Sequence, residues 1–311
     1  MSNGYCLPGK AGGSPFVLEM NKACGPFAKF IRVGLLSAIT LAPAVSAAQG
    51  VSLASGLTDF TSWSLFGSAT AQNQTPGNGF TYSELRLTNG TGGEAGAGFA
   101  PAAITLDFNQ SFSFDFHFFI PVSKDLRGDG MTFTLSDTPG VGGGGSSLGY
   151  AGLSSNSVAF AIDTFNFDGE PVSPSLQILQ HGASDPLAAT ETGLGDTIRD
   201  PNFQWFASVL YTPSGNGDET GTLQGTIEHI NLGTFSVSAL VDLSTVGPVV
   251  DGGHAVFFGF TAGNGLATDA HIVTSAAPVP LPAALWLLGS ALGGLGMVRR
   301  RTGHQRALAR A

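Results

Sequence analysis

The chain has 311 residues, of which 42% are hydrophobic, 11% are charged and 45 are glycine, without the three-residue glycine period of collagen. Its 23 Phe supply ample apolar surface to bury, which excludes a disordered chain. The net charge is −9. Between Gln49 and Ala277 there are 21 Asp and Glu but only four Lys and Arg, namely Arg86, Lys124, Arg127 and Arg199. This excess of acidic residues argues against binding nucleic acid or anionic lipid.

Residues 1–47 have the pattern of a short extension followed by a secretory signal peptide. Lys29 and Arg32 form a basic flank, Val33–Ala42 is a short apolar run, and small residues follow up to Ala47. Signal peptidase recognises this order of basic flank, apolar run and small residues. We therefore expect export and cleavage after Ala47 or the next residue; the alternative is a buried core helix.

Both cysteines of the chain, Cys6 and Cys24, precede the expected cleavage point. The exported protein is therefore expected to use neither disulfides nor thiol chemistry. The pattern leaves open whether translation starts at Met1 or Met20.

The central part of the chain alternates apolar and polar residues and has no sustained helical period. Strands are predicted around residues 112–118, 131–135, 158–162 and 256–260. Segments rich in Gly and Pro separate them, at residues 76–79, 90–98, 142–145, 213–217 and 252–253. Many short strands joined by turns predict one all-β domain, an antiparallel sandwich over residues 48–277.

The C-terminal part, residues 278–311, has three elements in order. Val279–Ala283 reads VPLPA, the run up to Val298 has no charge, and Arg299–Arg301 form a basic cluster. This order resembles the PEP-CTERM sorting signal. The resemblance implies cleavage by an exosortase, transient anchoring of 283–298 in the inner membrane, and delivery to the surface or exopolysaccharide matrix of a Gram-negative bacterium. A plain single-pass anchor is the alternative.

Several sequence blocks of the central part follow one another in a characteristic order. They are residues 60–69 with 85–88, then 111–116, 128–133, 144–150, 158–165 and 259–265, with His271 behind the last. Gly128–Phe133 is similar to A-D-G-x-x-F, Val158–Phe165 to V-A-x-E-x-D-T-[FY], and Gly259–Gly265 to G-F-S-A-x-T-G. Together the blocks resemble the legume-type (L-type) lectin domain, which implies a concanavalin-type jelly-roll β-sandwich.

The same resemblance implies a sugar site at one end of the sandwich. Such a site needs a carboxylate that accepts sugar hydroxyls, backbone N–H donors and a side-chain amide. The peptide bond before the carboxylate is cis in this family, which here is Gly128–Asp129. The residues that the resemblance assigns to the sugar are Asp129, Gly145 (with Gly144 or Ser146 fitting nearly as well), Asn166, Gly265 and Leu266.

The metal ligands are where the chain departs from the family. The family's Glu and His ligand positions hold Ala161 and Ser175 here, which argues against Mn²⁺. Calcium accepts six to eight oxygen ligands, water included, and therefore stays compatible with the chain. The expected Ca²⁺ ligands are Asp163, the carbonyl of Phe165, Asn166, and Asp168 or Glu170. The alternative is an acidic loop that binds no metal.

The predicted function is a secreted, non-enzymatic, carbohydrate-binding protein whose partner is a glycan or exopolysaccharide, handled by signal peptidase and exosortase during sorting. One alternative is a structural matrix protein that keeps the sandwich without binding sugar. Another is a glycoside hydrolase, which needs two carboxylates about 5–10 Å apart. Ala161 and Phe165 flank Asp163 on its strand face, so no second acid projects there, and no Ser-His-Asp grouping follows from the spacing.

Overall fold

The computed structural model describes residues 51–52, 59–75, 81–121, 126–167, 169–199 and 204–275. Within them, the 3₁₀ turns are η2 (Phe60–Ser62), η3 (Gly145–Ser147) and η4 (Gly195–Ile198). The strands are β1 (Val51–Ser52), β2 (Ser64–Gly67), β3 (Thr70–Gln74), β4 (Tyr82–Arg86), β5 (Ala95–Phe99), β6 (Ile104–Leu106), β7 (Phe112–Phe119), β8 (Gly130–Ser136), β9 (Ser157–Asp163), β10 (Ser175–Gln180), β11 (Ala188–Glu191), β12 (Trp205–Pro213), β13 (Thr220–His229), β14 (Gly233–Asp242), β15 (Val249–Val250), β16 (Gly253–Gly263) and β17 (Ile272–Thr274).

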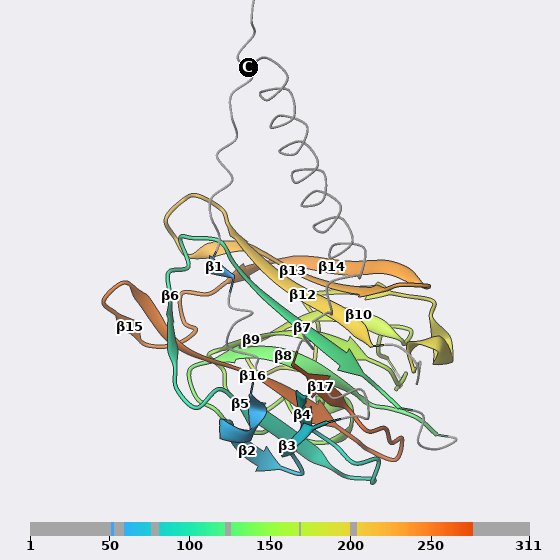
Figure 1. Ribbon diagram of the computed structural model, residues 1–311. Coiled ribbons are helices and arrows are strands. Elements are labelled where there is room, and N and C mark those ends of the chain that lie inside the picture. Colours follow the sequence, from blue (N-terminus) through green and yellow to red (C-terminus); the bar gives the residue numbers. More distant parts are fainter. Residues whose placement is uncertain are drawn as a thin grey trace, which may run out of the picture. The chain divides into compact units, whose positions relative to one another are not determined.

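These strands form two sheets that face each other (Figure 1). One sheet has the order β14-β13-β12-β7-β17-β4-β3, with β1 added to β7. The other has the order β11-β10-β9-β8-β16-β5-β2, with β6 and β15 added to β16. Strands that pair in a sheet are often far apart in the sequence, as β16 between β8 and β5 shows. The predicted all-β sandwich is confirmed.

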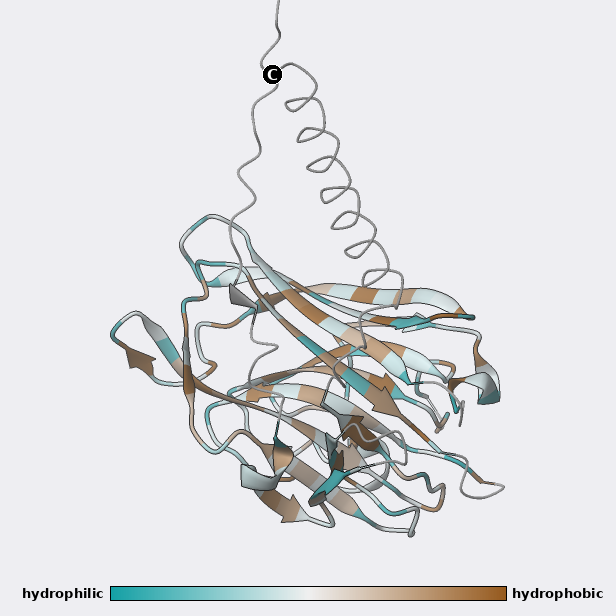
Figure 2. Cartoon of the chain, in the orientation of Figure 1, coloured by the Kyte–Doolittle hydropathy of each residue, from teal (hydrophilic) through white to brown (hydrophobic). Residues whose placement is uncertain are grey.

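The interior between the two sheets follows directly from the alternation in the sequence. On β7, Phe112, Phe114, Phe116 and Phe118 are buried, and the residues between them are half-buried. The ring of Phe116 lies 4.8 Å from that of Phe260 on the opposite sheet, in an edge-to-face contact. Figure 2 shows hydrophobic residues along the strands of both sheets.

The outer face of β8 and β9 is buried as well, because the loop between these strands folds over it. Leu148 and Tyr150 of this loop pack with Ala159, Ala161 and Leu179 in a second apolar cluster. Ala161, which stands at the family's Glu ligand position, is therefore part of an apolar contact. An ionised side chain at this position would lie in an apolar environment.

Two expectations about the chain's first strands need correction. The glycine-rich segment 90–98 was predicted as a breaker, but its second half forms β5. A side chain at Gly96 would collide with the carbonyl of Leu87, and one at Gly98 would lie 2.8 Å from Leu85 Cδ1, so these glycines allow close packing rather than a turn. Residues 60–62, grouped with the first strands, form the 3₁₀ turn η2.

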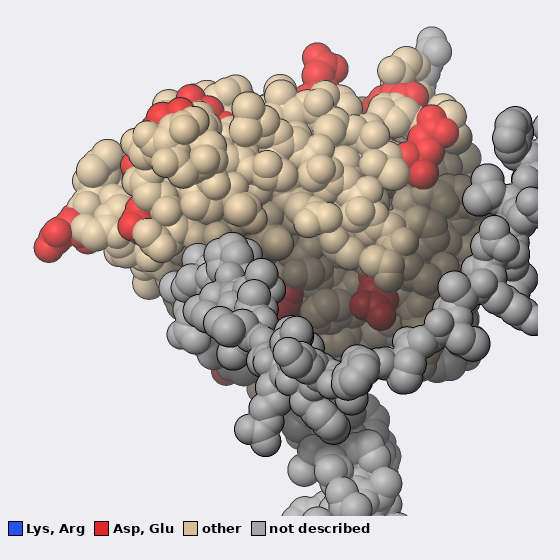
Figure 3. Space-filling view, turned by 90° about the horizontal axis from the view of Figure 1, so that it is seen from above, with Lys and Arg blue, Asp and Glu red and all other residues tan. Residues whose placement is uncertain are grey.

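Charge is distributed as the composition predicts. On the face seen from above in Figure 3, which looks onto the sheet containing β12, β13 and β14, the charged residues that the structure describes are acidic. No helix within the described residues has the length and apolar content needed to cross a membrane. The predicted signal peptide and the predicted sorting segment both lie outside the described residues.

Candidate functional site

The ends of three neighbouring strands bring the predicted site residues together. Gly130, the first residue of β8, pairs with Asp163 at the end of β9 and with Gly263 at the end of β16. The loops before β8, after β9 and after β16 therefore meet at one edge of the sheet. Asp129 lies in the first of these loops and Gly265 in the third.

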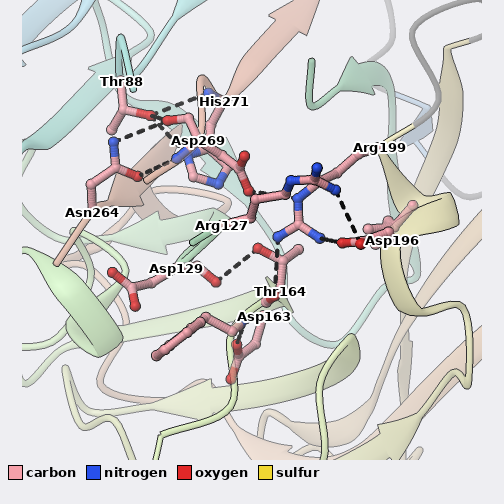
Figure 4. Close-up of polar contacts among 12 residues, drawn as sticks. Thr88, Arg127, Asp129, Asp163, Thr164, Asp196, Arg199, Asn264, Asp269 and His271 are labelled. Atoms are coloured by element: carbon pink, nitrogen blue, oxygen red, sulfur yellow. Dashed lines mark hydrogen bonds and ion pairs between the residues drawn. The ribbon is translucent and has the colours of Figure 1, made fainter. Parts of the chain in front are cut away.

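Asp129 is held through its backbone, by the contact to Thr164 drawn in Figure 4, and also through its side chain. The Gly128–Asp129 peptide bond is cis, as the resemblance predicted. The carbonyl oxygen of Asp129 accepts hydrogen bonds from the backbone N–H of Thr164 at 2.7 Å and from its hydroxyl at 3.0 Å. The carboxylate atom Oδ2 accepts a hydrogen bond from the backbone N–H of Gly265. These contacts fix where the carboxylate points.

Three of the five predicted sugar-binding residues are in close proximity. A Cβ atom built on Gly145 would lie 3.6 Å from Cα of Gly265 and 3.9 Å from Oδ2 of Asp129. One built on Gly265 would lie 3.1 Å from the same carboxylate oxygen. Both glycine backbones therefore border the Asp129 carboxylate, and a side chain at Gly265 would crowd its Oδ2 atom.

The two remaining predicted sugar contacts lie at the surface. The side chain of Leu266, directly after Gly265, is 93% exposed. Asn166 is also exposed, and within the described part of the chain no hydrogen bond joins it to Asp129. The structure thus assembles Asp129, Gly145 and Gly265, and leaves these two side chains facing solvent.

The electrostatic environment of Asp129 opposes its ionisation. The residue is only 5% exposed. Burial raises the pKa of the Asp129 carboxyl to about 6, the N–H of Gly265 acts in the opposite direction, and the charges of Glu170 and Asp269 add to the increase. At neutral pH the group is still mostly ionised and can accept hydrogen bonds from hydroxyl groups.

The predicted metal-binding residue Asp163 already has protein partners for both of its carboxylate oxygens. Oδ1 accepts from the N–H of Phe165 and from the hydroxyl of Ser173, each at 3.0 Å. Oδ2 accepts from the side-chain amide of Gln177 at 2.9 Å, and this amide also donates to Ser175 at 3.0 Å. Burial raises the pKa of the Asp163 carboxyl to about 7, and the charge of Glu170 adds to this effect.

The other predicted calcium ligands do not complete a cation site around Asp163. Glu170 accepts a hydrogen bond from the N–H of Phe167 at 2.9 Å, and Asp168 lies outside the described residues. The described residues contain no cluster of three or more His, Cys, Asp and Glu that could hold a metal. A calcium ion at Asp163 would have to compete with the N–H and O–H groups that donate to its oxygens. As arranged, the described residues do not fit calcium, and calcium binding stays a prediction.

The residues behind the Asp129 loop were not found from the sequence. Thr164 anchors the carbonyl of Asp129, and the buried Arg199 in turn donates to the carbonyl of Thr164 at 3.1 Å. A signal was available, because Arg199 and Arg127 are two of only four basic residues between Gln49 and Ala277. Because this acidic domain has so few Lys and Arg residues, each of them is a candidate for a specific ionic contact.

Solved structures with a similar fold include several plant lectins. The basic winged bean lectin with Tn-antigen matches with a TM-score of 0.54 and 20% identity, covering 71% of this chain and 95% of the lectin. The Bauhinia forficata lectin in complex with GalNAc matches with 0.54 and 21%, covering 68% and 90%. Peanut lectin with a 9mer peptide matches with 0.53 and 20%, covering 70% and 93%.

A scan against protein-family models finds no match, and neither does a search of curated proteins. At about one residue in five identical, the likeness to the plant lectins establishes the fold. The domain is therefore a legume-lectin-type jelly-roll β-sandwich, as the sequence blocks predicted. What the site binds is a separate question, and its answer depends on the residues at the sheet edge.

Proposed function

We propose that this protein is a lectin-like carbohydrate-binding protein whose sugar site is centred on Asp129. The observation that carries the proposal is the position of the Asp129 carboxylate, held against Gly145 and Gly265 at the edge of the sheet. An ionised carboxylate accepts two sugar hydroxyls, and a neighbouring backbone N–H donates to a sugar oxygen. Two proteins of similar fold were solved with Tn-antigen and with GalNAc, which supports this assignment.

The remaining predicted contacts complete the proposal around this centre. Leu266 and Asn166 are both exposed, and we assign them to the rim of the site, where an apolar group and an amide contact the sugar ring. We assign no catalytic step to the site. Calcium at Asp163 is the part of the prediction that the hydrogen bonds of Asp163 argue against, so the binding test must be run with and without the ion.

The cellular setting is proposed from the sequence. The signal-peptide pattern of residues 1–47 and the VPLPA segment with its basic cluster support export, exosortase processing and display on the cell surface or in the exopolysaccharide matrix. A surface or matrix polysaccharide is then the partner that the protein meets first.

The test is a broad glycan panel probed with the purified full chain in calcium, in magnesium and in chelator. Asp129→Asn, which keeps the size of the side chain and removes its charge, is expected to lose binding. Asp251→Asn, at the exposed turn before β16, is the matched control and is expected to bind as the unaltered protein does. A folded protein that binds no glycan under any condition would instead favour the structural matrix alternative.

A further inference from the structure

A buried ion pair lies directly behind the Asp129 loop. Arg199 follows η4 and is only 4% exposed, and Asp269 follows β16 and is fully buried. The guanidinium atom Nε of Arg199 lies 2.7 Å from Oδ2 of Asp269. A pair of charges this deep is retained only where its geometry is good and its remaining polar atoms are bonded.

One branch of contacts leads from Arg199 to the backbone of Asp129. The second guanidinium nitrogen of Arg199 donates to the carbonyl of Thr164 at 3.1 Å. The N–H and the hydroxyl of Thr164 both donate to the carbonyl of Asp129, at 2.7 Å and 3.0 Å. Arg199 is therefore separated from the candidate sugar carboxylate by a single residue (Figure 4).

A second branch leads from Asp269 to the other side of the same carboxylate. The N–H of Asp269 donates to Oδ1 of Asn264 at 3.2 Å, and the amide of Asn264 donates back to the carbonyl of Asp269 at 3.0 Å. Asn264 immediately precedes Gly265, whose N–H donates to the Asp129 carboxylate. The first branch thus holds the backbone carbonyl of Asp129, and the second holds the N–H of Gly265 that donates to its carboxylate. Together they set the direction of the carboxylate.

A third contact ties in the start of the loop. Asp196 lies 3.1 Å from the guanidinium of Arg127 and 3.3 Å from that of Arg199. Arg127 is two residues before Asp129. Half of the basic residues between Gln49 and Ala277 thus lie in one network at this end of the sandwich.

We propose that the Arg199–Asp269 ion pair, acting through Thr164 and Asn264, positions the sugar-binding carboxylate, so that the site needs no metal ion. The proposal rests on the proposed sugar-binding function. A guanidinium is a permanent cation with donors in a fixed fork, and it holds several acceptors at once, as a bound metal does. The carboxylate of Asp163 already accepts three hydrogen bonds, from Phe165, Ser173 and Gln177, and the described residues place no cluster of three or more His, Cys, Asp and Glu there for a metal.

The test compares hydrogen exchange in the full chain in the presence of chelator. Arg199→Lys keeps the charge but lacks the forked donors of the guanidinium. The double variant Arg199→Met with Asp269→Leu removes both charges and should stay folded, because no member of the ion pair remains. Arg86→Lys is the control, because Arg86 pairs with Glu84 on β4, outside the network. Peptides covering residues 126–131, 163–167 and 263–267 are followed against peptides from β12 and β13.

In the unaltered protein, these three loops should be protected from exchange in chelator. Both Arg199 variants should exchange faster there, with no change in β12 and β13. Their affinity for the glycan that the unaltered protein binds should fall by about 10-fold to 100-fold, the range found for outer-shell groups that orient the ligands of a metal. The affinity of the unaltered protein should be equal in chelator and in calcium.

Two results would overturn the proposal: loops that exchange alike with and without Arg199, and unaltered loops that become protected only when calcium is added. A separate result bears on the function alone. If the exchange pattern is as expected but the unaltered protein binds no glycan, the positioning by Arg199 stands and the proposed sugar binding fails.

Discussion

The interior between the sheets and the loop edge at Asp129 are held together in opposite ways. In the interior, Phe114, Phe116 and Phe133 contact several other rings each, so the contacts overlap and are non-directional. At the edge, one hydrogen bond connects Arg199 to Thr164 and two connect Thr164 to Asp129. Apolar burial tolerates variation in which residue makes a contact. In a series of hydrogen bonds, by contrast, removing one residue leaves its buried partners without a donor or acceptor.

This difference explains why the interior, but not the loop edge, can be predicted from short segments of the sequence. The interior needs only an apolar residue at every second position, which many sequences provide. The loop edge needs particular groups from residues as far apart in the chain as Arg199 and Asp269, and each unpartnered group there has a cost. Three sets of substitutions and a change of pH should affect the two regions differently.

A truncation in the interior is expected to have one of the two largest effects. Phe116→Ala removes a ring that packs against Phe133 and Phe260, and should lower the free energy of unfolding by about 3–5 kcal/mol. Phe206→Ala, on the partly exposed outer face of the same sheet, should cost about 1 kcal/mol or less. Chemical denaturation measures both, and equal losses would contradict the account.

The ion pair should behave unlike the interior when one partner is removed. Arg199→Met removes the cation that lies 2.7 Å from the buried carboxylate of Asp269 and should cost about 3–5 kcal/mol of unfolding free energy. Adding Asp269→Leu to the same chain should recover most of that loss, because the buried negative charge is then removed together with its cation. Denaturation curves of the two variants decide this. A double variant that is no more stable than the single one would show that the pair is not the stabilising unit.

A smaller change tests the glycine contact at the site. In Gly265→Ala the new Cβ lies 3.1 Å from Oδ2 of Asp129, so the carboxylate must move by a few tenths of an ångström. Glycan affinity should fall by about tenfold with little change in thermal stability. Gly140→Ala is the control, because its Cβ would lie at the same 3.1 Å from the movable tip of Leu153. Equal affinities of the two variants, measured by calorimetry, would remove Gly265 from the site.

The mildest perturbation is pH. The pKa of Asp129 is raised to about 6, and a proton on this carboxyl competes with sugar hydroxyls for the same oxygens. Affinity should therefore be constant above about pH 7 and fall as the pH drops through 6, to about one tenth at pH 5. Calorimetric titrations over this range, with melting curves to show that the protein stays folded, measure it. Affinity that is unchanged at pH 5 would place the sugar away from Asp129.

The sequence predicted the regions whose signal is local. β7, β8, β9 and β16 follow from alternation alone, and the Gly128–Asp129 cis bond and the grouping of Asp129 with Gly145 and Gly265 follow from the block resemblance. β5 was missed because its glycines serve close packing, which looks like a turn in sequence.

The contacts that span loops could not be predicted. Gln177 donates to Asp163 because β9 and β10 are paired, and only the register of those strands brings the two side chains together. In the same way, Arg199 reaches Asp269 across two separate loops. Such contacts depend on the completed fold and have no periodic signal in the sequence.

The central claim is that Asp129 binds sugar in a site that the protein itself holds in place. The most direct measurement is a crystal structure of the full chain with the tightest glycan of the panel, grown in chelator. The account predicts two sugar hydroxyls on the Asp129 carboxylate and a sugar oxygen at the N–H of Gly145, with Arg199 still paired to Asp269. A glycan bound elsewhere on the sandwich, or one that is bound only in crystals with a cation on Asp163, would contradict it.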